Sequence, residues 1–238
     1  MPPGAIGSQQ LQRGGPLPGY FQPVEVSGPE GIQIAPAVGG SFGDPKRDVM
    51  TAGMLIGAVY RLRVNNIPNA EGVEVYPTVE VIDRLYPPIG QEFRFPIPIN
   101  LSPEELEMAA EGKFVTRVIY VEDPDNATPV ARKDNEQAYF EVQAGDNPLD
   151  VADSLGRPVA ILRIGGRVPD ADGPDELFMY GSPPLVMWNP RQSPQTIRQQ
   201  PTFSGGPQVR LARPLRGRAQ RVSAIESTPA LKRQAITR

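Results

Sequence analysis

The sequence predicts a mainly β protein, a β-sandwich of the immunoglobulin-like or jelly-roll-like kind with two short connecting helices. Apolar and polar residues alternate in several runs between residues 60 and 164, as in strands with one buried face. Two short segments carry helix-start signals. The long helices and glycine-rich turns of a doubly wound α/β fold are missing. Together these observations favour a sandwich in which the helices serve as connections.

Proline and glycine divide the chain into four predicted parts. The 238 residues include 29 prolines and 24 glycines. Residues 1–46 are dense in both and predict an extended arm, in which residues 20–26 and 31–38 could add edge strands. We predict that the sandwich spans residues 47–168 and that residues 169–189 form an apolar extension that packs on it. Residues 190–238 are predicted to form a basic disordered tail.

The strands are expected where apolar residues recur with period two. Tyr60, Leu62 and Val64 alternate with Arg61 and Arg63. Two further alternating runs contain prolines, which lack a ladder donor. Pro77 predicts an edge strand or a bulge in the first run, and the prolines of the second predict a sheet edge. A later run is apolar on both faces and predicts a central strand. In chain order, these three runs and two more expected strands are residues 73–81, 93–99, 114–121, 138–143 and 159–164.

Two helices are expected from their end signals. Ser102 can cap a helix that begins at Pro103, Glu105 completes a capping box, and Gly112 supplies a left-handed stop, so we predict a helix near residues 103–111. The arrangement of a capping residue followed by proline occurs again at Asn147 and Pro148. The second helix is therefore predicted near residues 148–155.

The composition limits the chemistry available to this chain. It has no cysteine and no histidine, which excludes disulfides, thiolate metal sites, cysteine nucleophiles and imidazole catalysis. A glycosidase-type carboxylate pair remains open, and Glu80, Glu92 and Glu141 are strand-borne candidates. No acidic pair stands out from the 27 acidic residues. We therefore predict that the protein is not an enzyme and has no catalytic residues.

Two acidic loops are candidate sites for a hard cation such as Ca²⁺, the one cofactor that we consider. The first loop contains Asp123 and Asp125. The second contains Asp170, Asp172, Asp175 and Glu176, but it lacks the distal bidentate glutamate of a calcium loop. The alternative is that both loops are solvated turns.

Charge is distributed unevenly along the chain. Residues 190–238 contain ten basic residues and one acidic residue, a net charge of +9, so residues 1–189 carry −12 of the total of −3. A basic tail of this kind suits an anionic partner. We favour association with a protein, either another copy or an envelope component. Nucleic acid is disfavoured by the acidic body, and a peripheral anionic surface remains open. The candidate partner-binding residues are Arg210, Arg213, Arg216, Arg218, Arg221 and Trp188.

Four sequence segments carry a resemblance to a known group of proteins. They are Val59-Tyr-Arg-Leu-Arg-Val, Glu80-Val-Ile-Asp-Arg-Leu-Tyr-Pro-Pro, Val118-Ile-Tyr-Val-Glu-Asp-Pro and Pro158-Val-Ala-Ile-Leu-Arg-Ile-Gly. The chain resembles an uncharacterised family of bacterial secreted or envelope-associated β-sandwich domains over about residues 20–168. The resemblance implies an extracytoplasmic location and a non-enzymatic role. However, the N-terminus lacks the features of a signal peptide, and a cytoplasmic location is not excluded.

The function expected from these features is that of a non-catalytic structural or protein-interaction module of the cell envelope or extracellular space. Self-association or assembly would use strand edges and the basic tail. One alternative is a domain that binds carbohydrate or cleaves glycans with carboxylates. Another is a carrier of a nucleic-acid-binding tail. No stretch of the sequence is long and apolar enough to predict a transmembrane segment.

Overall fold

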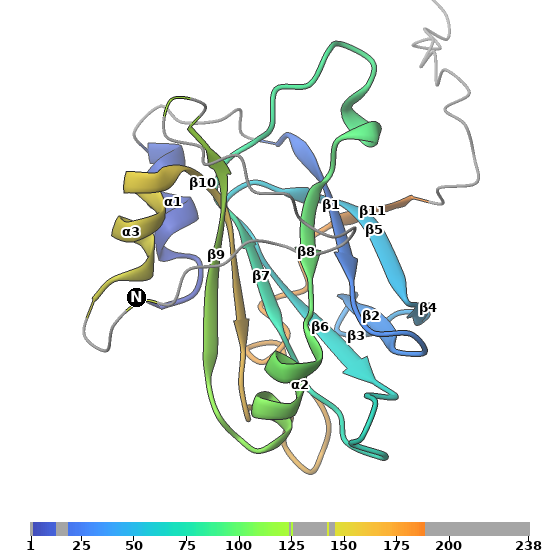
Figure 1. Cartoon of the computed structure of the whole chain (residues 1–238). Coiled ribbons are helices and arrows are strands. Elements are labelled where there is room, and N and C mark those ends of the chain that lie inside the picture. Colours follow the sequence, from blue (N-terminus) through green and yellow to red (C-terminus); the bar gives the residue numbers. More distant parts are fainter. Residues whose placement is uncertain (1, 13–18, 124, 126–141, 143–145, 189–238) are drawn as a thin grey trace, which may run out of the picture. The chain divides into compact units, whose positions relative to one another are not determined.

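The fold is a mainly β structure with two sheets and short helices, which confirms the predicted β-sandwich (Figure 1). The computed structural model describes residues 2–12, 19–123, 125, 142 and 146–188. The described residues all lie within one compact unit. Most of the strand predicted at residues 138–143 and all of the tail at 190–238 lie outside them.

The first sheet has four strands in the order β11-β5-β1-β8. β1 is antiparallel to β5 and parallel to β8, and β11 is antiparallel to β5. The strand predicted at residues 93–99 is shorter in the structure, where only β8 pairs with a neighbour. As its prolines predict, β8 lies at an edge of this sheet. The four strands are β1 (Phe21–Ser27), β5 (Val49–Leu55), β8 (Ile97–Asn100) and β11 (Leu185–Trp188).

The second sheet runs in the order β3-β2-β6-β7-β10-β9, with β4 paired to β2 beside it. All of its pairings are antiparallel. Its strands are β2 (Gln33–Val38), β3 (Ser41–Phe42), β4 (Lys46–Arg47), β6 (Val59–Asn65), β7 (Thr78–Val81), β9 (Val115–Glu122) and β10 (Gly156–Ile164).

The core is formed by the alternate residues that face inward from the two sheets. Val24 and Val26 of β1 and Met50 of β5 come from one sheet, and Leu62 of β6 and Leu162 of β10 come from the other; all are buried in a single cluster. Because side chains alternate along a strand, this burial turns the intervening residues of β6, β7 and β10 toward the outer face of the second sheet.

Three α-helices occur in the described residues, and two of them were predicted. α2 (Pro103–Ala110) has the expected capping box between Ser102 and Glu105, and α3 (Pro148–Leu155) is capped by Asn147. α1 (Ala5–Gln12) was not predicted. A short 3₁₀ turn, η1 (Glu92–Arg94), precedes β8. None of the described helices could span a bilayer.

Residues 19–46 form part of the sandwich, so the expectation of an extended arm was wrong for them. β1 is an interior strand, with Val24 and Val26 fully buried, and not an edge strand. Its Pro23 is accommodated because the pairing of β8 with β1 begins only at Val24, so Pro23 lies beyond the end of β8. The prediction of a central strand at residues 114–121 was also wrong about its position, because β9 is the last strand of its sheet in the described part.

Candidate functional site

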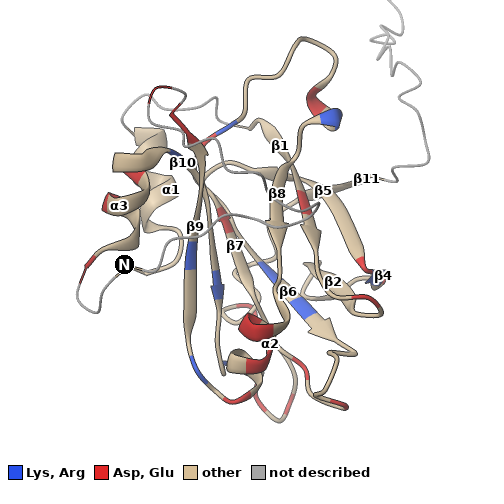
Figure 2. Ribbon diagram, viewed as in Figure 1, with Lys and Arg blue, Asp and Glu red and all other residues tan. Residues whose placement is uncertain are grey.

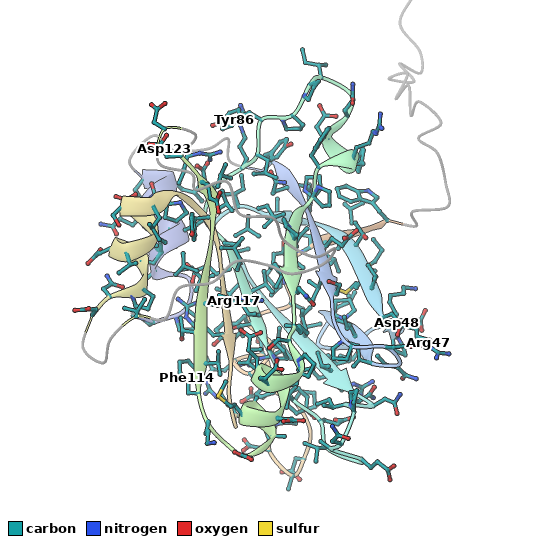
Figure 3. All side chains as sticks on the ribbon, viewed as in Figure 1. Arg47, Asp48, Tyr86, Phe114, Arg117 and Asp123 are labelled. Carbon is teal, nitrogen blue, oxygen red and sulfur yellow. The ribbon has the colours of Figure 1, made fainter. Side chains whose placement is uncertain are left out.

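The predicted acidic loops do not converge on a metal site in the described part of the chain. No group of three or more acidic side chains suited to hold a metal ion is found among the described residues. Asp175 instead accepts a hydrogen bond from the Phe178 backbone N–H, and the Asp170 carbonyl accepts from Gly173 in a turn. Asp123, labelled in Figure 3, accepts from the Asp125 N–H. These interactions are typical of the alternative reading, solvated turns.

Trp188, the predicted partner-binding aromatic residue, lies on edge strand β11. Its ring packs edge-on against Phe93, with 4.1 Å between the ring centroids, and it covers Gly53, where an added Cβ would lie 2.9 Å from the indole ring. Trp188 is half-buried by these contacts. The arginines predicted to accompany it, Arg210, Arg213, Arg216, Arg218 and Arg221, lie outside the described residues.

The most developed site is a pocket on the outer face of the second sheet. The floor comes from strand positions that alternate with core residues: Arg61 of β6, Thr78 of β7, Ile161 and Arg163 of β10, and Thr116 of β9. Figure 2 shows the basic residues of β6, β9 and β10 and the acidic residue of β7 that lies among these strands. Polar and charged groups are thus collected on a sheet face that sequence alternation alone would present to water.

Four parts of the chain wall this pocket, which has a volume of about 440 Å³: α1, α3, the turn at residues 175–182 and the residue before β9. Ile6 of α1 and Leu149 of α3 pack on the same face of the sheet, together with Ile161. Tyr180, from the turn at residues 175–182, lines another side. Phe114, labelled at the end of β9 in Figure 3, also lines the pocket and is 70% exposed. The result is a concave, largely apolar cavity with arginines at its base.

Arg61 is the distinctive group of the pocket. It is only 3% exposed, and it donates from Nε to the Phe178 carbonyl (3.0 Å) and from Nη1 to the Tyr76 carbonyl (2.7 Å). Its guanidinium carbon lies 4.4 Å from the Phe178 ring centroid and 5.0 Å from that of Tyr180. Nη2 is buried with almost no accessible surface and makes no hydrogen bond of good geometry among the described residues, while the Tyr180 side chain also interacts with the guanidinium. Arg61 therefore has an unsatisfied donor group, which a ligand could reach only if the side chains that cover it moved.

Burial lowers the pKa of Arg61 from its usual value. The Tyr180 side chain opposes this shift, and the like charge of Arg167 adds to it. An arginine remains protonated despite such a shift, because its ordinary pKa lies far above neutrality. The environment of Arg61 therefore holds a buried positive charge that no carboxylate neutralises within hydrogen-bond distance in the described structure.

A buried ion pair lies beside Arg61 on the same face. Arg163 donates from Nη1 to Glu80 Oε2 at 2.8 Å, and Glu80 is fully buried. The other carboxylate oxygen, Oε1, accepts from the Gly7 backbone N–H of α1 at 2.9 Å. Glu80 thus neutralises Arg163 and fixes α1 on the sheet. The charge of Arg163 is satisfied and that of Arg61 is not.

The sequence did not identify this pocket. Arg61 and Arg63 stood out only as the polar members of an alternating strand, and Glu80 only as one candidate glycosidase carboxylate. Glu80 does not line the pocket, and none of the described lining residues is acidic. The sequence did contain one signal of this site. Arginines occupy outward strand positions on β6 and β10, and a glutamate occupies one on β7, the strand between them.

The wall formed by α1 depends on a close approach between two glycines, so we expect Gly7→Ala to loosen this helix. A Cβ at Gly7 would lie 2.6 Å from the Gly57 Cα. Alanine normally stabilises a helix interior relative to glycine, by about 1 kcal/mol, yet overpacking here should cost about 1–3 kcal/mol. Hydrogen exchange at residues 5–12 measures the effect, with Ser8→Ala on the exposed side of α1 as the control. Equal or greater protection in Gly7→Ala would contradict the prediction.

Comparisons with family models, curated proteins and solved structures found no match for this chain. The resemblance to bacterial envelope-associated domains therefore stays a prediction, and the function is inferred from the pocket.

Proposed function

We propose that the protein is a non-catalytic binding module that recognises an anionic group of a partner in the arginine-lined pocket. The observation that carries this proposal is the state of Arg61, a buried cation that lines the pocket and has no carboxylate partner among the described residues. The proposal adds the pocket to the basic tail as a second region that could bind the anionic partner expected from the sequence.

The energetics of burial favour this assignment. A charge removed from water without a partner costs several kcal/mol, and an unsatisfied buried donor adds to that cost. The two carbonyls and two rings around Arg61 offset part of it. A bound anion would neutralise this charge in an environment where ionic hydrogen bonds are strong, and it would complete the hydrogen bonding of Nη2 once the side chains that cover it moved.

The lining chemistry supports binding over glycan cleavage. The lining residues include Arg61, Arg163 and Arg167 and no carboxylate among those described. A glycosidase needs two carboxyl groups across its cleft. Glu80, the nearest candidate, already accepts hydrogen bonds on both oxygens.

An anion screen tests the proposal. The melting temperature would be measured in acetate, benzoate, sulfate and phosphate at constant ionic strength, with chloride as the reference. We expect at least one anion to raise the melting temperature of the native protein, because a ligand that binds only the folded state stabilises it. Arg61→Gln should abolish this rise. Arg63→Gln is the matched control, because Arg63 is on the same face of β6 but does not line the pocket. A rise of equal size in Arg61→Gln, or none in the native protein, would refute the proposal.

Self-association remains a second candidate function, favoured by an apolar surface at the edge strand β11. Phe93, Val186 and Met187 are 47%, 41% and 37% exposed there, and β11 has a neighbour on one side only in the described sheet. A second copy could extend the sheet at this edge. Sedimentation velocity of the full chain and of Val186→Lys tests the idea. A monomer in both would exclude assembly through β11. Assembly through the tail, and the envelope location, are tested by removing residues 190–238 and by fractionation.

A further inference from the structure

We infer that the anionic group bound in this pocket is a carboxylate carried on an apolar body, with the carboxylate at Arg61 and the body against α1 and α3. This inference rests on the proposed function and deepens it, because it names the chemical class of the ligand. Three features of the pocket lead to it: the charge at its floor, the donors left free there and the nature of its walls.

The charge at the floor matches one negative charge. Two of the lining arginines are buried, Arg61 and Arg163. Glu80 neutralises Arg163 at 2.8 Å, so a single buried cation is left uncompensated. Arg167 is exposed, and water and salt screen its charge. A carboxylate brings one charge, whereas a phosphate monoester brings close to two at neutral pH. The second charge of a phosphate would be desolvated without a partner.

The free donors also match a group with two oxygens. Arg61 has used Nε and one hydrogen of Nη1 on carbonyls, and its unsatisfied Nη2 becomes available to a ligand if the side chains that cover it move. The Thr78 hydroxyl lies opposite Arg61 on the neighbouring strand β7 and can donate once, whereas Thr116 lies two strands farther across the floor. A carboxylate has two oxygens to satisfy and suits a guanidinium geometrically. A phosphate has three terminal oxygens, each of which accepts strongly.

The walls are mostly apolar, so they favour a ligand with an apolar body next to its carboxylate. Ile6, Phe114, Val118, Pro148, Leu149 and Ile161 supply most of the side chains around the arginines. A volume of about 440 Å³ lies toward the small end of ligand pockets, which span roughly 300–1,000 Å³. It therefore suits a small aromatic or branched aliphatic acid. Such a group can be a free acid or the chain-terminal carboxylate of a peptide whose last residue is apolar.

Calorimetry with matched probes tests the inference on the full chain. 4-Phenylbutanoate represents the free acid, and N-acetyl-glycyl-leucine represents a peptide terminus. 4-Phenylbutanamide removes the charge from the first probe and keeps its shape. Phenylpropyl phosphate replaces the carboxylate with a phosphate on a similar body. We expect at least one of the two carboxylates to bind at least tenfold more tightly than the amide and the phosphate. The tighter of the two carboxylates identifies the source.

Variants tie the binding to the pocket. Arg61→Gln should weaken carboxylate binding at least tenfold, and Arg63→Gln should leave it unchanged. Arg61→Gln also removes the hydrogen bond to the Phe178 carbonyl, which holds the 175–182 turn, and the one to the Tyr76 carbonyl, so its fold is checked by circular dichroism. Phe114→Ala avoids that risk, because the Phe114 side chain is exposed. It removes an apolar wall and should weaken carboxylate binding severalfold.

The possible failures can be told apart. Tighter binding of the phosphate than of either carboxylate, if lost in Arg61→Gln, would overturn the carboxylate inference and leave the proposed function standing. Equal binding of acid and amide would overturn both, because the charge would then play no part. Carboxylate binding that survives Arg61→Gln and Phe114→Ala would also overturn both, because it would occur elsewhere on the molecule.

Discussion

Replacing Glu80 with alanine is expected to lower the free energy of unfolding by about 3–5 kcal/mol, the usual cost of leaving one member of a buried ion pair without its partner. Glu80 is fully buried and Arg163 is only 8% exposed. The substitution would add a second uncompensated cation to the face that already holds Arg61. It would also leave the Gly7 N–H of α1 without its acceptor. Urea unfolding at neutral pH measures the loss.

A double-mutant cycle separates the charge effect from the loss of packing. In Glu80→Leu with Arg163→Met both charges are gone, and apolar side chains of similar size often replace a buried pair without loss of stability. We expect the double variant to be more stable than either single variant. Glu111→Ala is the control, because Glu111 pairs with Lys113 where both side chains are 63% exposed, and it should cost less than about 1 kcal/mol. A Glu80→Ala loss no larger than this control would contradict the prediction.

The elements that sequence reasoning recovered are those whose cause is local. α2 is specified within a few residues, because Ser102 and Glu105 satisfy each other's backbone N–H groups and Gly112 adopts a left-handed φ of 84° after the helix. α3 is set in the same way by Asn147 and Pro148. The strand at residues 159–164 was also recoverable, because it is nearly continuous in branched apolar residues and forms most of the buried β10.

The features that were missed depend on distant partners. Residues 20–26 were expected at most as an edge strand, and the interior position of β1 depends on its neighbours β5 and β8, whose contribution is invisible in a segment containing Pro23 and flanked by glycines. β9 has apolar residues on both faces although it ends its sheet in the described part, because α2 and α3 both contact it. The pocket has the same origin. Arg61 and Glu80 resemble solvated strand positions until α1 and the 175–182 turn cover them.

Raising the pH from about 10 to about 12 is expected to destabilise the fold through two buried tyrosines. Burial raises the pKa of Tyr60 from 10.0 to about 12, opposed by the hydrogen bond from the Leu55 N–H. Burial likewise raises the pKa of Tyr76 to about 12, assisted by its hydrogen bond to Glu74. A phenol is neutral when protonated, so the folded state holds these protons more tightly than the unfolded state. The stability that this provides is complete below pH 10 and is lost as the pH rises through 12.

The expected loss is about 2–3 kcal/mol for Tyr60, at about 1.4 kcal/mol per pKa unit, and it is smaller for Tyr76, because its hydrogen-bond partner Glu74 is partly exposed and water screens the charge there. Tyr60→Phe isolates one contribution. Its hydroxyl accepts from Leu55 N and donates to the Pro184 carbonyl, both at 2.8 Å, so the variant should start about 1–3 kcal/mol less stable at pH 8. The gap to the native protein should then narrow as the pH rises, because phenylalanine cannot ionise. Urea midpoints from pH 8 to pH 12 measure this, and Tyr76→Phe should behave in the same way.

Comparing each variant with the native protein at the same pH removes the contributions of lysines and other groups that titrate in this range. It also distinguishes the pKa effect from the lost hydrogen bonds, because the latter cost the same amount at every pH at which Tyr60 is neutral in both states. The decisive quantity is therefore the change in the stability gap with pH. If the gap between the native protein and Tyr60→Phe stayed constant from pH 8 to pH 12, the pKa of Tyr60 would be the same in the folded and unfolded chains. That result would contradict the burial of the Tyr60 hydroxyl between Leu55 and Pro184.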